Sequence, residues 1–168
     1  MKKFFIFIAN QTSVHFVIKL IVGIHSFYDR YWGFLRFKAF VPMSGKGSFY
    51  NSDIQIKYGQ NIKIGDFVKI GGGCVLGAMS NIVIGDYVTI SKNVTIETAG
   101  LDMTTPVPYK HKSKPIIIED GVWIASNVII LGGVTVGTNS IIGAGVVITK
   151  NVTPNTIVVG QGNRFINK

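Results

Sequence analysis

The chain has 168 residues and a formal net charge of +9, and 47% of its residues are hydrophobic. This length favours one domain with a substantial core, and so high a hydrophobic fraction excludes an intrinsically disordered protein. The charge is compatible with nucleic acid, an anionic membrane face, an acidic glycan or the phosphates of a cofactor, so by itself it selects no partner.

The first residues imitate a signal peptide only in part. Two lysines precede a short apolar run that ends after Ala9, and no clear cleavage site of small residues follows. A membrane-spanning helix needs about 20 predominantly apolar residues, and Asn10, His15 and Lys19 interrupt that length. The lone cysteine, Cys74, allows no intrachain disulfide and suits a reducing compartment. We therefore expect a cytoplasmic protein that does not cross a membrane.

Residues 14–35 follow helical spacing. Their apolar side chains form a wide face, with Gly23 and Gly33 as the points where the helix is expected to break. We expect this face to pack on the following domain or on a neighbouring subunit. Peripheral contact with the inner membrane through residues 1–40 is the alternative, because this segment holds six Lys or Arg and one acid, Asp29. Residues 1–47 are assigned to the helical segment and to a linker that begins at Pro42.

From residue 54 onward a six-residue repeat organises the sequence. A second apolar or small residue lies two positions before each apolar anchor of the repeat, and such a pair is one face of a short strand. A period of six predicts a parallel β-helix, in which each hexapeptide forms one wall of a prism and three walls form a coil. We therefore predict an all-β domain over residues 48–168. The anchors are Ile64, Ile70, Leu76, Ile84, Ile90, Ile96, Ile118, Ile124, Ile130, Val136, Ile142 and Ile148.

The phase of the repeat slips twice. Met79 and Ser80 form a two-residue bulge before Ile84, and a much longer insertion runs over residues 97–115. A solenoid accommodates an insertion as a loop that leaves the coil, and such loops often carry function. We expect one extended loop over residues 97–115 and look for the chemistry there.

The C-terminal half of the repeat also carries the motifs of a known family. The stretches 118–126, 133–137, 142–145 and 147–150 resemble the hexapeptide-repeat acetyltransferases, and the similarity covers roughly residues 54–166. The family includes galactoside and maltose acetyltransferases and many polysaccharide O-acetyltransferases. The resemblance implies a left-handed coil, which is an exception to the right-handed rule for crossovers. It also implies a homotrimer with active sites between adjacent subunits, and acetyl-CoA as the co-substrate.

By this resemblance we expect an acetyl-CoA-dependent O-acetyltransferase that acts on a sugar hydroxyl in bacterial surface polysaccharide, either capsule or O-antigen. We expect no metal and no nucleic-acid partner. Three alternatives stay open. One is an N-acetyltransferase that acts on an amino or nucleotide sugar. Another is a zinc-dependent carbonic anhydrase of the same fold, which needs three imidazoles per zinc. The last is a non-catalytic scaffold, which would have little need for the long insertion.

Acyl transfer to a hydroxyl needs a base, and in this family the base is a histidine. His15 and His25 lie in the helical segment, and His111 lies in the insertion. Galactoside-type members carry their histidine earlier in the loop, near Leu101 here. Other polysaccharide-type members are similar to this chain, with a histidine shortly before a Lys-Pro-Ile segment. By elimination His111 is the predicted base.

The neighbours of His111 suggest further roles. The lysines of the segment 110–114 would disfavour an imidazolium by like-charge repulsion, or would attract an acidic glycan or cofactor phosphates. Glu97 or Asp102 is expected to orient the imidazole. Asp102 and Tyr109 are the predicted substrate contacts.

The resemblance also assigns residues to the cofactor. Trp123 matches a tryptophan near the donor and acceptor tunnel. Thr149 and Lys150 match a pair near the nucleotide end, where Lys150 would pair with a phosphate. Arg164 holds the basic position of the closing segment, which here lacks the usual proline. The residues matched to the thioester and the pantetheine arm are Ala125, Ser126 and Ala144.

Overall fold

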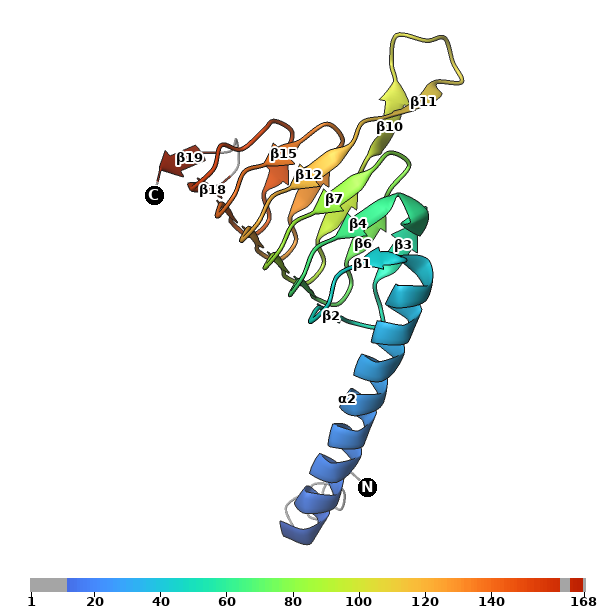
Figure 1. Ribbon diagram of the computed structural model, residues 1–168, viewed down its shortest axis with the longest axis vertical. Helices are drawn as coiled ribbons and strands as arrows, with labels where there is room; N and C mark the ends of the chain where they lie inside the picture. Colours follow the sequence, from blue (N-terminus) through green and yellow to red (C-terminus); the bar gives the residue numbers. More distant parts are fainter. Residues whose placement is uncertain (1–11, 161–163, 168) are drawn as a thin grey trace, which may run out of the picture.

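Figure 1 shows the computed structural model of the protein, which describes residues 12–160 and 164–167. The chain forms a left-handed parallel β-helix with one helix, α2 (Thr12–Phe40), at its N-terminal end and one hairpin that leaves its side. Three sheets of five, seven and five strands form the walls of the prism. The predicted fold class is confirmed. Among the described residues, no helix is long and apolar enough to cross a bilayer.

The three walls are named here in the order in which the chain visits them. Wall A consists of β1 (Met43–Ser44), β4 (Ile62–Ile64), β7 (Ile82–Ile84), β12 (Ile116–Ile118) and β15 (Thr135–Val136). Wall B consists of β2 (Phe49–Tyr50), β5 (Lys69–Ile70), β8 (Thr89–Ile90), β13 (Trp123–Ile124), β16 (Ile141–Ile142), β18 (Thr156–Val159) and the antiparallel β19 (Arg164–Asn167). Wall C consists of β3 (Gln55–Lys57), β6 (Val75–Gly77), β9 (Thr95–Glu97), β14 (Ile129–Leu131) and β17 (Val147–Ile148). A 3₁₀ turn, η1 (Gly59–Asn61), joins β3 to β4.

The core of the prism is the repeat itself. Every predicted anchor is buried, and so is the residue two positions before it. Cys74 and Ser140, the small residues in this series, are fully enclosed. Burial raises the pKa of the Cys74 thiol, and its Sγ donates to the carbonyl of Ser91 at 3.1 Å. Cys74 is therefore a buried residue of the core.

At the corner between walls A and B, aspartate side chains form hydrogen bonds between successive coils. Asp66 Oδ1 accepts the backbone N–H of Lys46 at 2.9 Å, and Asp86 Oδ1 accepts that of Asp66 at 2.7 Å. Asp120 Oδ1 repeats the contact with the N–H of Asp86 at 2.8 Å. Each carboxylate thus satisfies a backbone donor of the preceding coil. Corners also require left-handed backbone angles, which Asn tolerates better than most residues. Non-glycine residues with positive φ are Tyr58, Phe67, Tyr87, Asn93, Asn127, Asn139 and Asn155.

Helix α2 is continuous through Gly23 and Gly33, so the predicted break is wrong. Gly33 faces the first coil so closely that a Cβ there would lie 2.8 Å from the backbone oxygen of Tyr50. Phe37 is buried and stacks on the Tyr50 ring, with 3.6 Å between ring centroids. Only this C-terminal part of α2 packs on the β-helix, and the rest extends away from it (Figure 1).

The first coil begins earlier than expected. Residues 42–47, predicted as a linker, contain β1, which pairs with β4 through Met43–Lys63 and Ser44–Ile64. The Lys38 ammonium donates to the carbonyl of Ser44, and Val41 is fully buried, so the junction between helix and coil is tightly packed. Two-residue strands carry too little periodicity to be recognised before the repeat becomes regular.

We predict that Ile118→Ala destabilises the fold by about 2–5 kcal/mol, because it removes buried methyl groups and leaves a cavity in the core. Ile117→Ala is the matched control. Ile117 precedes it in β12 but points outward and is 40% exposed, so its truncation should cost well under half as much. Urea unfolding followed by circular dichroism measures both. Equal losses would contradict the inward and outward assignment.

Candidate active site

Both interruptions of the repeat lie at the corner between walls C and A, and they are bonded to each other. The hydroxyls of Ser80 and Ser113 lie 2.6 Å apart. Thr98 is only 2% exposed, accepts the backbone N–H of Ser80 at 3.0 Å and donates to the carbonyl of Gly77 at 2.9 Å. The small bulge thus anchors the base of the long insertion.

The long insertion is a β-hairpin. Its strands are β10 (Ala99–Asp102) and β11 (Lys110–Ser113), and it projects well beyond the coils (Figure 1). The register pairs Leu101 with His111 and Asp102 with Lys110. Residues directly opposite each other in an antiparallel pair share a face, and successive residues alternate. His111 therefore shares a face with Leu101, whereas Lys110 and Lys112 lie on the other face with Asp102.

The Asp102 carboxylate is held by partners on that second face. It accepts the hydroxyl and the backbone N–H of Thr104 at 2.8 and 3.2 Å, and Lys112 Nζ lies 3.4 Å away. The hydrogen bonds from Thr104 and, to a smaller extent, Lys112 hold its pKa below the usual range. Of the two acids considered for orienting His111, Asp102 is therefore bonded elsewhere.

Glu97 lies on the same side as His111. Both line a groove of about 250 Å³, together with Lys57, Tyr58, Gly77, Met79 and Ala99. Glu97 Oε1 accepts the backbone N–H of Ala99 at 3.1 Å. A Cβ at Gly77 would collide with the other carboxylate oxygen, so a glycine is needed there for the acid to take this position. The groove is thus lined by both an exposed imidazole and a carboxylate that is bonded to the backbone.

A second groove, of about 320 Å³, lies on the other side of the hairpin base. It is lined by Thr98, Ala99, Gly100, Lys112, Ser113, Lys114, Leu131 and Gly132. Thr149 and Lys150 are exposed and follow β17, the neighbour of β14 in wall C, so they lie one coil beyond Gly132 at the same corner. This corner therefore gathers His111, Thr149 and Lys150 of the predicted site, together with the exposed Lys112 and Lys114.

The other predicted cofactor residues lie elsewhere on the prism. Trp123 faces outward from wall B, is 49% exposed and donates its indole N–H to Ser91 Oγ at 3.4 Å. Ala125 and Ser126 follow β13 at the corner between walls B and C, and Ala144 follows β16 at the same corner one coil later. Within one chain these residues form one group. Wall C separates that group from His111 and Lys150.

Two predicted residues take no defined part in either group. Tyr109 is 37% exposed and directly precedes β11. The backbone of Arg164 pairs with Val159 in wall B. Its side chain lies outside the described part of the chain, as do residues 161–163 of the closing segment.

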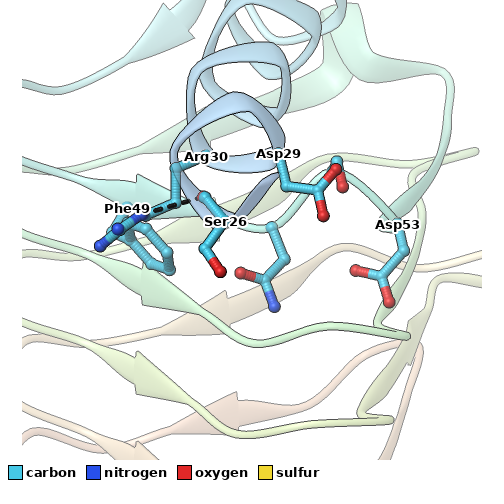
Figure 2. A pocket seen from close by; sticks show the side chains of 7 residues that line it. Ser26, Asp29, Arg30, Phe49 and Asp53 are labelled. Carbon is cyan, nitrogen blue, oxygen red and sulfur yellow. Dashed lines mark hydrogen bonds between the residues drawn. The ribbon is translucent and has the colours of Figure 1, made fainter. Parts of the chain in front are cut away.

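A third groove lies at neither place. It has a volume of about 620 Å³ and lies between α2 and the first coil (Figure 2). No sequence motif signals it, because it forms only where a helix face meets a coil. Its lining residues are Ser26, Asp29, Arg30, Phe49, Asn51, Ser52 and Asp53. In the described residues, no three His, Cys, Asp or Glu side chains gather as a metal site would require.

Comparison with known proteins agrees with this architecture. The family described as Bacterial transferase hexapeptide (six repeats) matches residues 115–150. The galactoside O-acetyltransferase of Escherichia coli K12 is 35% identical over 128 residues, which are 73% of this chain and 61% of the relative. The chain thus spans about three fifths of the length of this curated relative.

Solved structures of acetyltransferases are similar to this chain in fold as well as in sequence. A hexapeptide-repeat acetyltransferase from Vibrio cholerae, crystallised with acetyl coenzyme A, is 31% identical with a TM-score of 0.75, over 79% of this chain and 74% of the other. A maltose O-acetyltransferase from Clostridium difficile is 34% identical with a TM-score of 0.69, over 79% and 72%. With these identities, this coverage and the repeat itself, the chain belongs to the hexapeptide-repeat acetyltransferases.

Proposed function

We propose that the protein is an acetyl-CoA-dependent O-acetyltransferase that modifies a sugar hydroxyl during the synthesis of bacterial surface polysaccharide. The observation that carries the proposal is the groove that the solvent-exposed His111 and the Glu97 carboxylate line together. The sugar acceptors named for the Escherichia coli and Clostridium difficile relatives support a glycan substrate. The net charge of +9 favours an acidic glycan as the acceptor. The single cysteine suits the cytoplasm.

In this mechanism His111 acts as the general base. An alcohol is a poor nucleophile while it keeps its proton, so the imidazole takes that proton as the hydroxyl oxygen bonds to the acetyl carbon. The thioester of acetyl-CoA supplies the acetyl group, and the proton passes from the imidazolium to the departing sulfur. We assign Glu97 as the positioning residue, because a carboxylate in the same groove favours the imidazolium that forms.

The donor would run between small residues at the corner of walls B and C in one copy and cationic residues at the corner of walls C and A in the next. Ala144 is exposed, and a Cβ at the adjacent Gly145 would meet nothing within 4 Å, so this surface leaves room for a pantetheine arm. Lys150 and Lys114 supply charge for the phosphates, since charge-assisted hydrogen bonds are among the strongest in proteins. These features fit the chemistry of coenzyme A.

The separation of the two groups supports a homotrimer. His111 belongs to the corner between walls C and A, and Trp123 and Ala144 belong to wall B and its corner with wall C. One chain alone holds them apart, so a complete site needs the hairpin of one copy against wall B of the next. Exposed apolar side chains on wall C, such as Ile129 and Leu131, support an interface there.

We predict that His111→Ala lowers kcat by about 10²- to 10⁴-fold and leaves the affinity for acetyl-CoA unchanged, because the lost step is proton transfer. Steady-state kinetics with galactosides, maltose and amino sugars as acceptors, and calorimetry with acetyl-CoA, measure the two effects. His25→Ala is the control, since His25 is exposed on α2 and pairs with Asp29. Transfer by His111→Ala at the rate of the unmodified protein would refute the assignment.

We predict that Lys150→Ala raises KM for acetyl-CoA by about tenfold and leaves KM for acetyl-pantetheine unchanged, because the second donor has no phosphate. Lys63→Ala, an exposed lysine on wall A, provides the matched loss of charge. A parallel rise of KM for both donors would show that Lys150 does not act through a phosphate.

We predict a native mass of three times the 18.3 kDa chain by analytical ultracentrifugation. Ala144→Trp should be inactive because the indole fills the pantetheine path. Co-expressed with His111→Ala, it should restore about one quarter of full activity, since each site draws one intact part from each of two copies. Inactive mixed trimers would place the whole site within one chain.

A further inference from the structure

Helix α2 carries a broad apolar surface that none of the described residues covers. With about 100° between successive residues of an α-helix, one group of large side chains spans about 120° of its circumference. These side chains are between 55% and 69% exposed. The group is called the apolar arc, and its members are Phe16, Leu20, Ile24, Phe27, Tyr28 and Tyr31.

The β-helix lies on the opposite side of α2. Gly33 and Phe37, which contact the first coil, lie about 160° and about 120° from the centre of the arc on the same projection. Figure 2 shows Ser26 and Arg30, from this polar side, facing the groove that Asp53 lines. A flat surface could therefore meet the arc while the coils stayed on the other side of the helix.

The charges beside the arc have one dominant sign. The described helix holds four cations and one acid, and none of them belongs to the arc. The acid, Asp29, pairs with His25 at 3.2 Å. Lys19 lies about 60° beyond the Phe16 edge of the arc, where its long side chain would reach the headgroups of a surface that receives the arc. The whole chain, at +9, adds to this attraction.

We infer that α2 lies in the surface of an anionic lipid membrane, with the apolar arc among the headgroups and upper acyl chains and the β-helix on the water side. A helix with a polar face, a cationic margin and aromatic side chains on its apolar face has the composition of an interfacial helix. A second copy of α2 is the competing occupant. It fits less well, because one acid in the helix offers few ion pairs between copies.

The test is sedimentation of the protein with vesicles of phosphatidylcholine and phosphatidylglycerol in a 3:1 ratio, compared with vesicles of phosphatidylcholine alone. Binding to the mixed vesicles should be about tenfold stronger and should weaken at high salt. Equal binding to both kinds of vesicle, or binding to neither, would overturn the inference.

Two matched double variants test whether the apolar arc is the face of α2 that binds the membrane. Leu20→Glu with Ile24→Glu places two carboxylates in the arc, and Ile18→Glu with Val22→Glu places two on the polar side at exposed apolar positions. Both pairs change the charge equally, so only orientation differs. The arc pair should bind mixed vesicles at least about tenfold more weakly than the control pair. Equal effects, or a fall in native mass caused only by the arc pair without loss of vesicle binding, would overturn it.

Both pairs should leave the thermal midpoint of the β-helix unchanged, because these positions do not contact the core. An unchanged midpoint with lost vesicle binding supports the inference. A lowered midpoint in the arc pair alone would mean that the arc packs on protein, and would contradict it.

Discussion

The hydrogen bonds between successive coils constrain everything else in this molecule. Each wall residue bonds to the coils on either side, as when the backbone N–H of Gly65 donates to Ile84 and that of Gly85 donates to Ile118, both at 2.8 Å. A residue added inside a wall would break this ladder and shift inward side chains to the outside. Extra chain must therefore leave at a corner. The bulge at Ser80 and the hairpin do so at the same corner, and their mutual hydrogen bonds keep the hairpin base rigid.

This rigidity bears on the chemistry. A base on a long loop without regular structure would sample many positions, and a misplacement of about 1 Å can cost a hundredfold in rate. Here His111 is a residue of a paired strand whose foot is fixed through Ser113 and the buried Thr98. The alternation of the hairpin also sends the neighbouring lysines to the face opposite the imidazole. Their charge is thus close to the site without lying beside the ring.

The walls and their buried residues could be predicted because apolar residues recur every six positions along the sequence. The pairing within the hairpin could not, because nothing in residues 97–115 alternates in polarity strongly enough to set a register. For the same reason the bond between Asp102 and Lys112 was not foreseen. The helix was recognised from its spacing, yet spacing alone does not say which face meets the coil. Counting hexapeptides forward from Ile118 assigns Trp123 to the next wall, whereas His111 lies in the insertion before Ile118. The spacing of the repeat therefore already indicates that the two residues are separated within one chain.

The two ends of the β-helix are capped by different structures. At the start, Phe37 lies over Tyr50 and covers the first coil. At the finish, β19 runs antiparallel to β18, against the direction of every other strand in wall B. Exposed strand edges can template pairing with another chain, and a stack of identical coils could in principle grow end to end into a filament. In wall B, the edge that a second molecule would meet is β19, which runs opposite to the other strands of the wall. The parallel pairing of coils cannot continue from that strand into the first coil of another molecule, and this opposes growth into a filament.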